Sequence, residues 1–173
     1  MKRKITIAII IILCYLLQCT LFQTLSFAGI SPNLLVVTAS AFGFMRGQKE
    51  GLLTGLFCGL IMDIFSGGTM LGFYALLYMY VGFLNGYFRK LFYPEDIKLP
   101  MLLIAGSDLL YNLALYFFLF LFRRKLNFVF YFMHIILPEL VYTMTVTIVL
   151  YMILLKVNQH LELMEKRSAK KFV

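Results

Sequence analysis

The chain consists of long apolar runs separated by short charged or glycine-rich segments. Most of these runs approach the ~20 residues that an α-helix needs to cross a hydrocarbon core about 30 Å thick. The pattern predicts six membrane-spanning helices, at residues 5–25, 32–45, 50–65, 70–88, 100–122 and 128–155. We therefore expect an all-α integral membrane protein with a transmembrane domain over residues 1–157 and a charged tail over 158–173.

Local signals place some of the helix ends. Ser31-Pro32 pairs a capping serine with a proline in the first turn, which predicts that the second helix opens at Pro32. Pro100 opens the fifth helix in the same way.

The mixed-charge tail after residue 155 is expected to be either a surface helix or disordered. The basic start and first apolar run resemble a signal peptide, but the run exceeds the usual 7–15-residue core, so we expect a retained helix.

Composition supports the membrane interpretation. Hydrophobic residues make up 62% of the chain and charged residues 14%, whereas a soluble domain carries about 25% charged residues. The net charge of +8 does not indicate nucleic-acid binding, because the basic residues flank apolar runs instead of forming one face interleaved with aromatics. Cys14, Cys19 and Cys58 lie inside apolar runs without a CxxC motif, so we interpret them as packing residues.

The distribution of lysine and arginine predicts an orientation. If the N-terminus is cytoplasmic, 13 of the 16 basic residues fall in cytoplasmic segments. Such an excess fixes topology in membrane proteins and here favours six spans with both termini inside. Arg123, Arg124 and Lys125 depart from this bias. They are either a functional outside patch, which we favour because the other loops agree with the bias, or a sign that one apolar run is mis-assigned.

Glycines recur at four-residue spacing in the third helix, at Gly51, Gly55 and Gly59, with Asp63 in the same register. Residues four apart share a helix face, and a stripe of small residues lets a neighbouring backbone approach closely in a membrane. The fourth helix carries Gly82 and Gly86. The stripe is expected to pack within this chain's own bundle or, as a less favoured alternative, against another protein.

Four ionisable residues fall within or beside the apolar runs. Asp63 ends its helix beside a Gly-Gly turn and is expected to be hydrogen-bonded to the following loop, because a carboxylate there opposes the helix dipole. Asp108, His134 and Glu139 lie at membrane depth, where ionisable groups are costly unless they face the bundle interior and are paired. They form a candidate polar cluster, which acts either as helix–helix glue or in chemistry.

No catalytic or nucleotide-binding motif accompanies these residues. His134 and Glu139 do not form the HExxH zinc pattern, and the sequence contains no GxSxG or Walker loop. We therefore expect no enzymatic activity, no metal and no cofactor.

The order Pro32-Asn33-Leu34-Leu35, then the glycine series to Asp63, then Leu71-Gly72 resembles the rod shape-determining protein MreD family. The resemblance covers nearly the whole chain, including Leu137-Pro138 in the last helix. It implies a bacterial inner-membrane scaffold that works with MreC, the actin-like MreB, and the glycosyltransferase and transpeptidase that extend peptidoglycan, in contact with membrane lipid.

The same resemblance implies the six-helix fold of the S-components of energy-coupling-factor transporters, and this provides the rival function of vitamin binding. S-components usually carry an Ala-x3-Ala docking pattern in the first helix. Here Ala8 is followed four residues later by Ile12, so the pattern is missing and the scaffold is favoured.

Overall fold

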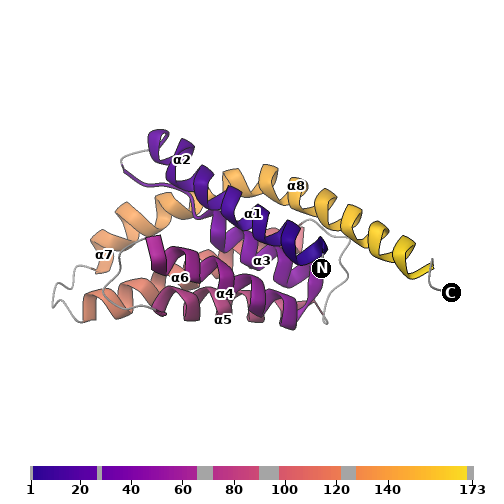
Figure 1. Cartoon of the computed structure of the whole chain (residues 1–173). Helices are drawn as coiled ribbons and strands as arrows, with labels where there is room; N and C mark the ends of the chain where they lie inside the picture. Colours follow the sequence, from indigo (N-terminus) through magenta and orange to yellow (C-terminus); the bar gives the residue numbers. More distant parts are fainter. Residues whose placement is uncertain (1, 27–28, 66–71, 90–97, 122–127, 171–173) are drawn as a thin grey trace.

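The computed structural model describes residues 2–26, 29–65, 72–89, 98–121 and 128–170. All regular secondary structure in these ranges is helical. In chain order the helices are α1 (Lys2–Cys19), α2 (Leu21–Thr24), α3 (Leu34–Arg46), α4 (Gln48–Phe65), α5 (Phe73–Phe88), α6 (Lys98–Leu121), α7 (Phe128–Tyr131), the π-helix η1 (Phe132–Ile136) and α8 (Leu137–Lys170). The predicted all-α bundle of about six principal helices is confirmed (Figure 1).

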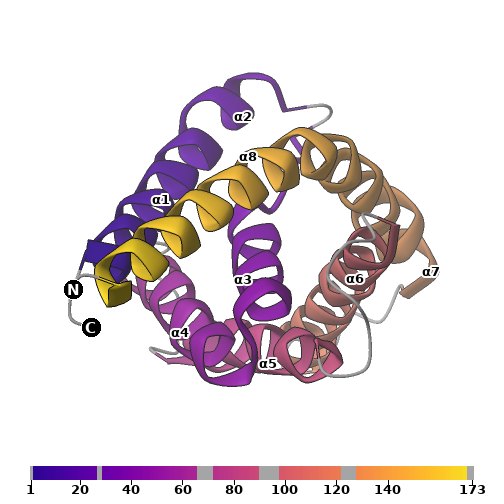
Figure 2. The same ribbon diagram turned by 90° about the vertical axis from the view of Figure 1, so that its right-hand side faces the viewer.

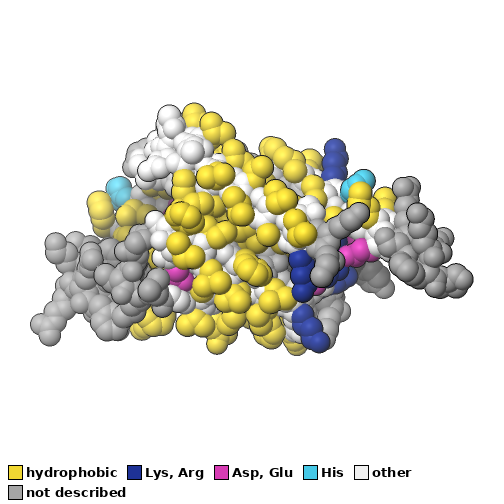
Figure 3. All heavy atoms as spheres, viewed as in Figure 1, with side chains coloured by type: hydrophobic (Ala, Val, Ile, Leu, Met, Phe, Trp, Pro, Cys, Tyr) yellow, Lys and Arg dark blue, Asp and Glu magenta, His cyan; other side chains and the backbone are white. Residues whose placement is uncertain are grey.

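The short helix α3 is the centre of the bundle. Figure 2 shows α1, α4, α5, α6 and α8 arranged around it. Every residue from Leu34 to Met45 is buried, which fits a helix that is apolar on all sides. The outer face of the bundle is also apolar, and Figure 3 shows hydrophobic side chains covering its middle. A molecule that is apolar both inside and outside is suited to a lipid environment.

Helix length separates the elements into two groups. Among the described residues, three helical segments are long and apolar enough to cross a membrane: Arg3–Thr24, Lys98–Phe118 and Phe128–Lys166. The 13 residues of α3 extend only about 20 Å, less than the ~30 Å hydrocarbon core. The central helix is therefore accommodated by burial among longer neighbours.

The helices alternate in direction along the chain, so that both termini lie at the same end of the bundle (Figure 1). The turn between α3 and α4 and the start of α6 at Lys98 lie toward this end. Figure 3 shows lysine and arginine side chains gathered there. The two ends of the chain therefore lie on one side of the bundle.

Several predicted boundaries need correction. The first helix is interrupted at Thr20, between α1 and α2. The fifth begins at Lys98, so Pro100 lies in its first turn and does not open it. The second helix begins at Leu34, and Asn33 is its N-cap in place of Ser31. The last helix does not end near residue 155, because α8 continues without a break to Lys170. The expected division between residues 157 and 158 therefore falls within a continuous helix, and much of the charged tail is helical.

The π-helix η1 lies directly before Pro138. In an α-helix the proline ring would clash with the carbonyl four residues back, at His134. Here the Leu137 N–H donates to the Phe132 carbonyl, five residues back, so the helix is locally widened. The wider turn lets η1 and α8 continue as one path through the proline.

Candidate functional site

The five predicted packing glycines lie at the contact between α4 and α5. We call this set the glycine seam: Gly51, Gly55, Gly59, Gly82 and Gly86. All five are buried, and a Cβ added at Gly55 would overlap the carbonyl oxygen of Tyr78. At Gly59 it would lie 2.6 Å from the backbone nitrogen of Ala75, and at Gly86 it would lie 2.5 Å from the Cα of Gln48. The seam is therefore a backbone-to-backbone contact within this chain.

Asp63 ends the glycine seam and caps the start of α5. Its carboxylate accepts hydrogen bonds from the backbone N–H groups of Tyr74, at 3.2 Å, and Ala75, at 2.9 Å. These are first-turn donors of a helix whose N-cap, Gly72, has no capping side chain. Most of the loop to which Asp63 was expected to be hydrogen-bonded lies outside the described residues. Within them, the Asp63 charge lies against the positive end of the α5 helix dipole.

Asn33 joins three helices at the centre of the bundle. Its side-chain oxygen accepts from the Val36 N–H at 3.2 Å and from the Tyr78 hydroxyl at 2.9 Å. Its backbone N–H donates to the Thr143 hydroxyl oxygen on α8 at 3.2 Å. The neighbouring Leu34 N–H donates to Gln18 of α1 at 3.0 Å. These contacts satisfy backbone N–H groups that have no partner within the helix at the start of α3. Such groups need protein partners there, because the buried start of α3 has little access to water.

The two predicted acids at membrane depth lie near each other beside this junction. Asp108 of α6 is fully buried, and Glu139 of α8 is close enough to it for the two carboxylates to repel when both are ionised. Asn112 lies beside Glu139 and donates to the Asp108 backbone carbonyl at 3.2 Å. The Thr143 hydroxyl is near the Asp108 carboxylate. Neither of the two carboxylate oxygens of Asp108 has hydrogen-bond geometry with any described residue.

His134, predicted as the third member of this cluster, is not part of it. Its side chain is exposed and stacks on Phe130, with ring centroids 4.3 Å apart. Its Nδ1 lies 3.1 Å from the Phe130 carbonyl oxygen. His134 lies within the widened turn η1, and its side chain is on the outer surface. The cluster therefore contains Asp108 and Glu139 but not His134.

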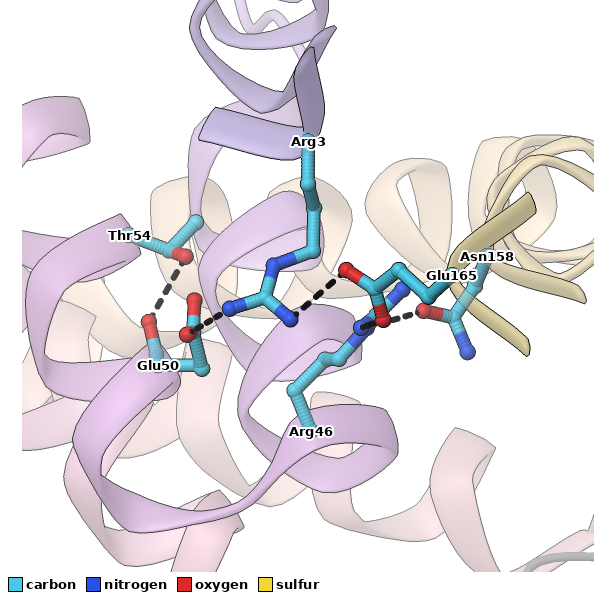
Figure 4. A network of polar contacts seen from close by, with 6 residues as sticks. All are labelled: Arg3, Arg46, Glu50, Thr54, Asn158 and Glu165. Carbon is cyan, nitrogen blue, oxygen red and sulfur yellow. Dashed lines mark hydrogen bonds and ion pairs between the residues drawn. The ribbon is translucent and has the colours of Figure 1, made fainter. Parts of the chain in front are cut away.

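A second polar cluster ties the bundle together at the end where the termini lie (Figure 4). Arg3 of α1 forms ion pairs with Glu50 of α4 and, at 2.9 Å, with Glu165 of α8. Arg46 of α3 pairs with Glu165 at 3.4 Å and donates to Asn158 at 2.5 Å. We call these five residues the terminal clasp, and it connects four helices, including the segment of α8 predicted as tail.

The remaining predicted features are the basic loop and the three cysteines. Arg123, Arg124 and Lys125 lie outside the described residues. Cys14 and Cys58 are buried and Cys19 is exposed, and all three are free thiols. Within the described ranges no group of three or more His, Cys, Asp or Glu side chains is placed to hold a metal ion.

Sequence reasoning missed several of these polar residues. Tyr78 and Tyr111, whose rings lie 5.0 Å apart in the core, are indistinguishable in the sequence from other aromatics of apolar runs. The Asn85 side chain donates to Ser107 at 2.6 Å across α5 and α6, and neither residue belongs to a motif. The N-cap role of Asn33 could have been predicted, because asparagine directly before an apolar run is a strong N-cap.

Comparison with known proteins gives the family. The family model described as rod shape-determining protein MreD matches residues 1–161 of the 173-residue chain. No significant match was found among curated proteins or solved structures. The match covers α1 to α6 in full and most of α8, and it includes the glycine seam and the contacts of Asn33. The chain therefore belongs to the MreD family of rod shape-determining membrane proteins.

Proposed function

We propose that this chain is a non-enzymatic scaffold of the bacterial cell-elongation machinery in the inner membrane. In this role it organises peptidoglycan synthesis together with MreC, and with MreB and the elongation glycosyltransferase and transpeptidase. The observation that carries the proposal is the family match over residues 1–161, which supports involvement in rod shape determination.

The described contacts support a scaffold because they hold helices together. The glycine seam, the Asn33 junction and the terminal clasp each connect two or more helices. A rigid bundle of this kind acts by presenting helix faces and short loops to partners. The Arg123-Arg124-Lys125 loop is the most basic segment predicted on the outside face, and we assign it to recruitment of MreC.

Depletion in a rod-shaped host tests the function. Cells should become round as the protein is lost, and vitamin uptake should stay intact. MreC should co-purify from mild detergent. Cells that remain rod-shaped but become vitamin auxotrophs would support the rival S-component function instead.

Charge reversal at Arg123 and Arg124 tests the assigned loop. MreC recovery should fall while the thermal midpoint in detergent stays the same, and the loss should be steeper at low salt because exposed charges are screened at high salt. An equal loss of folding and binding would contradict the assignment.

Topology is tested with an impermeant thiol reagent. Both termini are proposed to be cytoplasmic, so a cysteine at Thr69, a residue outside the described ranges, should react from the outside. A cysteine in the tail should react only after the membrane is opened. Tail labelling in intact cells would contradict the proposed orientation.

A further inference from the structure

A groove of about 250 Å³ lies between α1 and α4, on the opposite side of α4 from the glycine seam. Its walls include Lys4, Ala8 and Ile11 of α1 and Glu50, Leu53 and Phe57 of α4. We call it the α1–α4 groove. The side chains of Leu53 and Phe57 are 40% and 54% exposed, so the groove opens on the outer surface of the bundle.

The dimensions of the groove fit part of one extended hydrocarbon chain. Its lining covers seven steps along each helix, from Lys4 to Ile11 and from Glu50 to Phe57, which is about 10 Å at 1.5 Å per residue. A groove of this volume, about two helical turns long, is too small for a helix, which is about 10–12 Å wide with its side chains. The volume is also below the ~300–1,000 Å³ typical of small-molecule pockets.

The groove is polar at one end only. Lys4 and Glu50 lie at the end near the termini, and the remainder of the lining is almost entirely apolar. Glu50 is paired with Arg3, and the two arginines of the terminal clasp balance its two glutamates. Lys4 is exposed and has no ion pair among the described residues, so it is the charge available to a ligand. A long lysine at a membrane boundary extends toward the head groups, where it meets phosphate.

From this geometry we propose that the α1–α4 groove binds one acyl chain of an anionic phospholipid, whose phosphate is held by Lys4. The apolar walls match the chain, and the position of the lysine at the charged end matches the head group. This site is independent of the proposed scaffold function, since it requires no protein partner.

Lipid binding to the purified full-length chain tests whether the Lys4 charge holds the lipid phosphate. The probes are phosphatidylglycerol and phosphatidylcholine added to detergent micelles, with binding followed by native mass spectrometry and by the thermal midpoint. Lys4→Gln should weaken phosphatidylglycerol binding about fivefold, the factor that corresponds to ~1 kcal/mol per basic side chain at a membrane surface, and should leave phosphatidylcholine binding unchanged. Lys98→Gln is the matched control, because Lys98 is exposed and begins α6, which lies across the bundle from α1 and α4 (Figure 2).

Filling the groove tests the location. Ala8→Phe should abolish the tightly bound lipid, and Ile9→Phe, which points outward from the same helix turn, should retain it. A photoreactive side chain at Ala8 should cross-link lipid in native membranes. Retained binding in Ala8→Phe, an equal response of the two lipids in every variant, or a cross-link to a protein would each overturn the proposal.

Discussion

The two faces of α4 solve the problem of helix contact in opposite ways. One face carries Gly51, Gly55 and Gly59 and lies against the backbone of α5 with no room for a single added carbon. The opposite face carries Leu53 and Phe57, packs loosely on α1 and leaves a groove of about 250 Å³. Both faces are free of charged side chains over their central turns, so charge does not distinguish them.

The difference shows that side-chain size determines how closely each face of α4 packs on its neighbour. We call the glycine face, which contacts α5, the closed face, and the Leu53 and Phe57 face, which borders the groove, the open face. In lipid there is little hydrophobic gain from bringing two helices together, so association depends on close packing. Glycines permit that packing across α4 and α5, and no lipid or partner helix can enter there. Bulky side chains on the α1 side prevent it and leave space that lipid can occupy. The closed face should therefore be intolerant of substitution, and the open face tolerant.

Gly55→Leu should have the largest effect, because it breaks the closed face. The added side chain must displace the backbone at Tyr78, and overpacking of this kind should lower the free energy of unfolding by about 3 kcal/mol. Titration with a denaturing detergent measures the loss. Gly106→Leu is the matched control, since a Cβ at Gly106 meets nothing within 4 Å, and it should remain close to the parent.

Asp63→Ala should have the next largest effect. It removes the acceptor for two first-turn N–H groups of α5 and the charge that faces the helix dipole, which should cost about 1–2 kcal/mol. Asp63→Asn keeps a side-chain acceptor and should recover part of the loss in the same titration. If the alanine variant matches the parent, the cap does not hold α5 in register.

Leu53→Ala should have a smaller effect than either substitution on the closed face. The Leu53 side chain is 40% exposed and already borders a groove, so its removal enlarges a space that lipid fills. We expect a change below about 1 kcal/mol in lipid-containing micelles, well under the cost of a buried leucine deletion. A loss as large as that of Gly55→Leu would show that the α1 contact is as close as the α5 contact.

Glu165→Gln should have the smallest effect of the series. Glu165 joins Arg3 and Arg46 in the terminal clasp, but its side chain is 45% exposed, so screening should limit the loss to about 0.5 kcal/mol. The loss should disappear at high salt. A Glu162→Gln control, which touches only the Asn158 amide in the described contacts, should show no salt dependence.

Much of the architecture could be predicted because hydrophobic runs and glycine spacing are local signals. The run lengths gave the principal helices, and the four-residue spacing of Gly51, Gly55 and Gly59 indicated a close helix contact. The identity of the facing helix could not be predicted, because pairing depends on the three-dimensional order of helices around α3. The spacing therefore left the partner of the stripe open, and the structure assigns it to α5.

The polar residues were harder to place. Asp108 and Glu139 were found because an acid in an apolar run is conspicuous, but His134 was wrongly added to them. The sequence did not reveal that the π-turn before Pro138 would leave the His134 side chain on the surface. The terminal clasp was missed because Arg3 and Glu165 are 162 residues apart and only the fold brings them together.

The most direct test of the closed glycine seam combines stability and partner binding in one preparation. Gly55→Ala adds a single carbon at the α4–α5 contact, and both the thermal midpoint and the MreC recovered per folded molecule are measured in mild detergent. Because α5 of the same chain covers this face, the account predicts a lower midpoint and unchanged MreC recovery. An unchanged midpoint with reduced MreC recovery would contradict it and would make the glycine stripe an interface with the partner.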